Sequence, residues 1–206
     1  SRRRHTRLRR DWSSDVCSSD LMGLDVAKEL DICLDFMILQ SFSHGKSKKA
    51  SMKLHSLVIG PPGVGKKLLT ITAKILNPIS DEIASTDGKI TIAGLVGSSS
   101  KAKGGGFKSI PGYLPRASSG VLCIQDFHEV KKNRKAIFSL LSKMMEDGEV
   151  IDSTSAGWIH EAITSIHLDT NKYSQVSLTD GNNSIKDIDI PTNILSRFDF
   201  IIDIPR

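Results

Sequence analysis

The pattern of apolar and polar positions predicts an alternation of helices and short strands. Apolar residues recur at helical spacing from Leu24 to Phe42, which predicts an amphipathic helix followed by a polar loop, SHGKSKK. The apolar run from Leu54 to Ile59 predicts a short buried strand. A second helix is predicted from Lys66 to Ile75, and the Asn77-Pro78 pair ends it. This half of the chain therefore has a strand between two helices.

The second half continues this alternation. The segment from Gly94 to Gly112 is rich in Ser, Gly and Lys and predicts a long exposed hairpin. Val121 to Ile124 predicts a second buried strand, and a helix follows from about Lys131 to Met145. The remaining segments are a hairpin and two more strands: Glu149–Ile159, Ala162–Leu168 and Ile201–Ile204. Strands that alternate with helices predict an α/β fold, a mostly parallel sheet flanked by helices.

Composition separates the first residues from the rest of the chain. The 206 residues, 39% of them hydrophobic, suit one domain with a real core. The first ten residues hold six Arg, and residues 11–21, DWSSDVCSSDL, resemble the conceptual translation of a sequencing-adapter primer. We therefore exclude residues 1–21 from fold reasoning, which lowers the net charge from +5 to +2. The alternative is a basic arm that binds nucleic acid.

Cysteine usage and hydropathy indicate in which cellular environment the protein functions. Outside the first residues only Cys33 and Cys123 remain, without a CxxC pair or a His/Cys cluster at metal-ligand spacing. The sequence therefore predicts neither a disulfide framework nor a zinc site, and it indicates a reducing, intracellular location. No apolar run reaches the ~18 residues of a membrane span, and nothing resembles a secretory signal. We expect a soluble protein without a membrane partner.

The segment GPPGVGKK carries the clearest chemical signal. It fits the pattern GxxxxGK between a predicted strand and a predicted helix, where backbone N–H groups surround a β-phosphate and the lysine reaches the β- and γ-phosphates. The alternative is an ordinary strand-to-helix turn rich in Gly and Pro. The predicted nucleotide-binding residues are Gly60, Pro61, Pro62, Gly63, Val64, Gly65, Lys66 and Lys67.

Six segments in order resemble the AAA+ ATPase core of the minichromosome maintenance (MCM) replicative helicases. They are GPPGVGK, IAGLVG, PGYLPRASSGVLCIQDF, MMEDG, LDTNK and IDIPTNILSRFDFIID. The resemblance covers residues 22–206 and implies an AAA+ P-loop NTPase fold with inserted β-hairpins, with the chain stopping before the helical lid. It also implies ATP and Mg²⁺ as ligands, DNA as a partner, a ring that is normally a hexamer, and location in a nucleus or a prokaryotic nucleoid or cytoplasm.

Three positions depart from the pattern of the family. Lys67 stands where a Ser or Thr hydroxyl normally ligates Mg²⁺, and an ammonium has no acceptor. Gln125 and Asp126 stand where Asp and Glu normally hold the metal and polarise the attacking water. Asp126 is therefore expected to serve the metal or act as the base, and hardly both. Taken alone, GVLCIQDF also fits a buried strand that ends in two polar residues.

The resemblance assigns two further catalytic residues by position. Asn171 corresponds to the sensor that orients the lytic water, and its alternative is a capping or turn residue. Arg197 corresponds to the arginine finger, which reaches the nucleotide of a neighbouring subunit. The alternative for Arg197 is a surface arginine paired with Asp199.

The resemblance places DNA contacts on two hairpins. In the first, Lys101, Lys103 and Lys108 would contact phosphates and Phe107 would stack on a base. A flexible solvated loop is the alternative. The second hairpin, around Asp152 to Trp158, lacks the lysine that the family carries there.

Three functions remain open at this point. The first is an ATP-hydrolysing motor that moves along DNA, with Lys66, Asp126, Asn171 and a neighbour's Arg197. The second is a degenerate nucleotide-binding subunit with a structural or regulatory role, which the residues at 67 and 125 favour. The third is another AAA+ remodeller with a similar loop and hairpin.

Overall fold

The structure is a computed structural model, and it describes residues 28–46, 51–101, 104–151, 157–171 and 190–204. The adapter-like segment 1–21, Lys103 and residues 152–156 of the second hairpin lie outside the described residues. So do residues 172–189, which include the first two residues of the segment IDIPTNILSRFDFIID.

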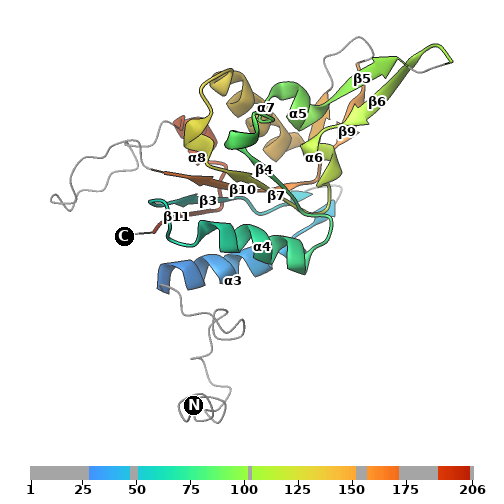
Figure 1. The fold of residues 1–206 in the computed structure, drawn as a ribbon. Helices are drawn as coiled ribbons and strands as arrows, with labels where there is room; N and C mark the ends of the chain where they lie inside the picture. Colours follow the sequence, from blue (N-terminus) through green and yellow to red (C-terminus); the bar gives the residue numbers. More distant parts are fainter. Residues whose placement is uncertain (1–27, 47–50, 102–103, 152–156, 172–189, 205–206) are drawn as a thin grey trace, which may run out of the picture.

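A five-stranded parallel sheet forms the centre of the molecule (Figure 1). Its order is β11-β3-β10-β7-β4, with bounds β3 Ser56–Ile59, β4 Asp81–Ala84, β7 Val121–Gln125, β10 Ser165–Thr170 and β11 Phe200–Asp203. The predicted α/β fold is confirmed. Four of these strands were predicted, and the edge strand β4 is an addition. Its sequence, DEIA, has one buried apolar residue and thus no apolar pattern.

Two helices cover one face of the sheet, where β3 and β7 contribute every second side chain. These helices are α3 (Lys28–Phe42) and α4 (Lys66–Leu76), and they lie together beneath the sheet in Figure 1. Val58 and Cys123 point to this face and pack with Leu34, Met37 and Leu69. The alternation of side chains along each strand explains how one strand serves two cores.

The other face carries the larger core. Leu57, Ile59, Leu122 and Ile124 point to it, and Phe127 lies fully buried among them. The helices on this side are α5 (Ile92–Val96), α6 (Tyr113–Arg116), α7 (Arg134–Asp147) and α8 (Thr192–Leu195), with the 3₁₀ turns η1 (Ser85–Asp87) and η2 (Phe127–Glu129). Burial of both sheet faces explains why β3 and β7 are almost continuously apolar.

Three short antiparallel pairs lie outside the main sheet. They are β1 (Gly45–Lys46) with β2 (Ser51–Met52), β5 (Gly97–Lys101) with β6 (Phe107–Pro111), and β8 (Glu149–Ile151) with β9 (Ile159–Glu161). The predicted hairpin at 94–112 therefore starts three residues later, because α5 takes the residues before Gly97. A contact of 3.1 Å between Ser109 Oγ and His160 Nε2 joins β6 to β9. In the described ranges no helix is long and apolar enough to cross a membrane.

Candidate functional site

The loop between β3 and α4 has the shape of a phosphate cradle. Gly63 and Gly65 adopt positive φ angles of 86° and 90°, in the left-handed region that glycine tolerates best. A Cβ on Gly65 would also lie 2.8 Å from Leu30 Cδ2 of α3, so a side chain is excluded twice. Gly60 N–H donates to the Thr170 carbonyl (3.1 Å), which fixes the start of the loop to β10.

Lys66 points its ammonium into this loop. Its Nζ donates to the Gly60 carbonyl (2.7 Å) and to Asn171 Oδ1, and lies 3.5 Å from the Thr170 carbonyl. Burial lowers the pKa of Lys66, and the nearby carboxylates of Asp169 and Asp126 oppose that shift. The structure thus brings Lys66, Asn171 and Asp126 together, as the sequence predicted.

Gln125 contacts α4 and β4. Its Nε2 donates to Thr70 Oγ1 (3.0 Å) and lies 3.5 Å from Glu82 Oε2. Lys67, the next departure from the family pattern, has an exposed side chain. These two positions therefore supply no acidic or hydroxyl ligand to the loop.

Asp169 is a second carboxylate at the site, and the sequence reasoning missed it. It lies on β10 with 3% of its surface exposed, and its Oδ1 accepts a hydrogen bond from Asp126 N–H (2.8 Å). Burial raises the pKa of Asp169 to about 6, whereas the Asp126 amide and the Lys66 ammonium lower it. In the sequence, Asp169 directly follows the predicted strand Ala162–Leu168 and belongs to the segment LDTNK, of which only Asn171 was given a role.

His128 is the other residue that the sequence reasoning missed. Its ring contacts Asn171 twice, with Nδ1 3.3 Å from the Asn171 backbone nitrogen and Nε2 3.1 Å from Asn171 Nδ2. His128 belongs to η2, the turn that begins directly after Asp126. Its contacts with Asn171 therefore connect the end of β7 to the end of β10. The Asn171 side chain is held between His128 and Lys66.

The loop fits a nucleotide better than it fits the usual magnesium arrangement. Open space above Gly63, the left-handed glycines and the buried ammonium suit a phosphate chain. Protein-bound Mg²⁺ commonly uses one or two carboxylates together with the phosphates, and Asp126 is the predicted acidic residue that remains on this side. Among the described residues, no group of three or more His, Cys, Asp or Glu side chains could hold a metal ion alone.

Arg197 lies apart from this loop, after α8 and beside the end of α7. Its guanidinium pairs with Glu146 of α7 (2.7 Å), and it does not pair with Asp199 as one interpretation of the sequence had it. Asp199 Oδ2 instead accepts from the His55 backbone N–H (2.8 Å). Arg197 and Asp199 are only two residues apart in the sequence, but they do not form the ion pair that this closeness indicated.

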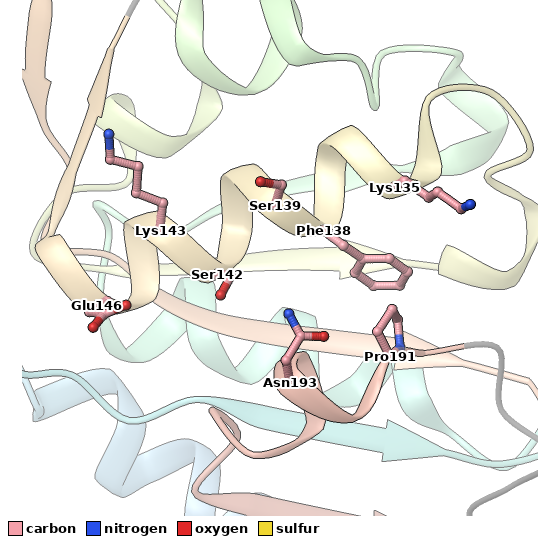
Figure 2. Close-up of a pocket in the computed structure, with 8 residues that line it drawn as sticks. All are labelled: Lys135, Phe138, Ser139, Ser142, Lys143, Glu146, Pro191 and Asn193. Carbon is pink, nitrogen blue, oxygen red and sulfur yellow. The ribbon is translucent and has the colours of Figure 1, made fainter.

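A surface pocket adjoins the Arg197–Glu146 pair, between α7 and α8 (Figure 2). Its volume is about 440 Å³. Lys135 and Lys143 lie toward its two ends, with Asn193 facing the helix between them (Figure 2). The remaining lining residues are Phe138, Ser139, Ser142, Glu146 and Pro191. This pocket contains none of the residues of the phosphate loop.

The first hairpin presents two of the three predicted DNA-binding lysines. Lys101 and Lys108 are exposed on paired strands, and Phe107, opposite Lys101, is 50% exposed. Lys101 and Phe107 are cross-strand partners and share one face of the hairpin, whereas Lys108, next to Phe107 in β6, lies on the other face.

Comparison with known proteins adds one finding to this geometry. A protein-family model described as the MCM P-loop domain matches residues 15–205, most of the chain. A search of the curated proteins finds no match.

Proposed function

The chain belongs to the MCM family of P-loop domains, and from that premise we propose that it is the ATP-driven core of a ring-shaped motor that moves along DNA. The nucleotide-binding module is what the family and the phosphate loop establish. Hydrolysis, the ring and DNA translocation are the parts that we propose. The meeting of Lys66, Asn171 and Asp126 at one loop carries the proposal.

Nucleotide binding would use the loop and Lys66. The backbone N–H groups of the loop surround the phosphates, and the Lys66 ammonium exchanges the Gly60 and Asn171 oxygens for phosphate oxygens. Mg²⁺, when bound with ATP, would neutralise phosphate charge. In this scheme the phosphates and water would hold most of its coordination sphere, because Asp126 is assigned to the base.

Hydrolysis would use the residues at the ends of β7 and β10. Water attacks the γ-phosphorus, the bond to the β-phosphate oxygen breaks, and ADP and phosphate form. Asp126 accepts the proton of the water, and Asn171, held by His128, orients that water. Asp126 is one methylene shorter than glutamate, so we expect slow turnover.

The ring would be needed because Arg197 lies away from its own phosphate loop. It projects beside α7 and α8, where a neighbouring subunit could present its nucleotide. Arg197 must then leave Glu146. An arginine finger supplied in trans accelerates related reactions by about 10³–10⁵.

DNA-stimulated ATP turnover by the assembled ring tests this proposal. Turnover should rise on addition of single- or double-stranded DNA, and the K101A/K108A variant should lose that stimulation but keep its basal rate. Rings that form but show no stimulation by any DNA would refute the motor.

A degenerate nucleotide-binding subunit with a regulatory role is the second candidate. The orientation of Gln125 toward Thr70 and Glu82 favours it, together with Lys67, because each position removes one usual metal contact. ATP binding would then act as a structural signal without turnover.

The triple variant K67T/Q125D/D126E separates the two candidates. If this variant hydrolyses ATP and the natural sequence does not, the natural site is regulatory. Equal turnover in both proteins shows that the natural site already works with Asp126.

A further inference from the structure

Asp169 places a carboxylate in the buried interior of the sheet, on the same face of β10 as Ser165 and His167. All six residues of β10 are buried, and Asp169 lies at the carboxyl end of this strand, between β3 and β7. A buried carboxylate costs free energy unless hydrogen bonds compensate for the lost water. The Asp169 carboxylate must therefore accept a hydrogen bond from a group outside β10.

That contact is the hydrogen bond from Asp126 N–H to Asp169 Oδ1, 2.8 Å long. Asp126 has a φ of 51°, in the left-handed region that costs free energy for residues other than glycine. A hydrogen bond to a carboxylate is stronger than one to a neutral acceptor. The bond thus fixes the chain at the point where β7 turns into η2.

The turn at Asp126 decides which side chain faces the phosphate loop. Gln125, one residue earlier, points to Thr70 and Glu82. The charges of Asp169 and Asp126, by contrast, both act on Lys66. The two carboxylates therefore lie near Lys66, and the Asp126 backbone is held by Asp169.

We propose that Asp169 is a positioning residue, whose carboxylate holds the Asp126 main chain in the conformation that directs the Asp126 side chain to the phosphate loop. The inference rests on the proposed function, in which Asp126 takes the proton of the attacking water. It assigns to β10 a role in catalysis besides carrying Asn171.

The variants D169V and D169N test this role. Valine fills a similar volume in a strand but accepts no hydrogen bond, whereas asparagine keeps an acceptor oxygen. We expect the Asp126 amide in D169V to exchange with solvent roughly tenfold faster or more, as a freed amide does, and in D169N to stay within about threefold of the natural chain. ATP turnover per assembled ring should fall in D169V and be largely retained in D169N.

Two further measurements separate positioning from a purely structural role. D169V should melt at the same or a higher temperature, because it removes a buried carboxylate. Its nucleotide affinity should equal that of D169N, because both variants remove the charge near Lys66. The double variant D126N/D169V should be no slower than D126N alone, since Asp169 acts through Asp126. The control I166V alters the same strand and should leave the Asp126 amide unaffected.

Unchanged exchange of the Asp126 amide in D169V would overturn the proposal, whatever the turnover. If D169V does not fold, D169S replaces it, because the serine hydroxyl is too short to reach the amide. A natural chain that binds ATP without turnover refutes the proposed hydrolysis, and the amide measurement still decides whether Asp169 holds Asp126.

Discussion

Single side chains decide whether the phosphate loop can hold a nucleotide, and Lys66 contributes most. It is 8% exposed, and the contacts it makes all go to oxygens at the ends of β3 and β10. A buried ammonium without such partners would be unstable. The same property makes it a strong partner for a phosphate oxygen that enters the loop.

Replacing Lys66 by alanine should weaken ATP binding by about 10- to 150-fold, because a charge-assisted hydrogen bond is worth ~1.5–3 kcal/mol. Titration with a fluorescent ATP analogue measures the change. Lys74→Ala, at the exposed end of the same helix, is the matched control and should bind normally. Equal affinities for natural protein and K66A would show that the phosphates bind elsewhere.

Two buried histidines should make the fold sensitive to acid. Burial lowers the pKa of His55 to about 3 and of His167 to about 4, so both are neutral in the folded protein and bind protons on unfolding below pH 6.5. Asp169 opposes them below pH 6, because its folded pKa is raised. Between pH 6 and pH 4 the unfolded state therefore binds about one proton more than the folded state.

Stability should therefore fall by ~1.4 kcal/mol per pH unit across that window. Denaturant unfolding at pH 7.5, 6 and 5 measures it. The variant H167Q should flatten the slope, because glutamine does not titrate. A free energy of unfolding that is constant or rises toward pH 5 would contradict the assignment of neutral histidines.

At the scale of elements, the paired strands β5 and β6 carry exposed basic residues. They pair over five residues, and the Ser109–His160 contact links them to the second hairpin. The contact connects β6 to β9, so a movement of one hairpin is transmitted to the other. Exposed Lys101 and Phe107 share one face, which offers a charge and a ring to a nucleic-acid strand, and Lys108 adds a charge on the other face.

The double variant K101A/K108A should weaken DNA binding and lower the slope of log K against log salt by roughly 1.5, since each phosphate contact contributes ~0.7–0.9. Binding measured at several salt concentrations gives that slope. Lys89→Ala, outside the hairpin, should leave it unchanged. An unaltered slope in the double variant would assign the hairpin no phosphate contacts.

Sequence patterns predicted the elements whose apolar positions repeat regularly and failed where they do not. The strands β3 and β7 are mainly apolar, with the sequences SLVI and VLCIQ, whereas DEIA of β4 is recognisable only through its pairing with β7. The resemblance to the family predicted that Lys66 and Asn171 meet at one site. Asp169 could not be predicted, because its role depends on the bend at Asp126, a tertiary feature.

At the scale of the whole molecule, the separation of Arg197 from the phosphate loop predicts shared sites. K66A and R197A should each be nearly inactive, and mixing them should restore part of the turnover, because a subunit with Lys66 can meet a neighbour with Arg197. Turnover measured against the mixing ratio tests this. Glu146→Ala, which only frees Arg197, should not lower it. A mixture as inactive as its components would place Arg197 in a structural role.

The order of the sheet also dictates when the phosphate loop can form. Strand β3 is flanked by β10 and β11, both made more than a hundred residues later in synthesis. Pairings between such distant segments are slow, because a long loop must close before any contact is gained. On a ribosome, the strand that carries the loop must therefore wait unpaired for almost the entire domain. The ability to bind ATP should be acquired last, and recovery of ATP binding should follow the slowest phase of refolding.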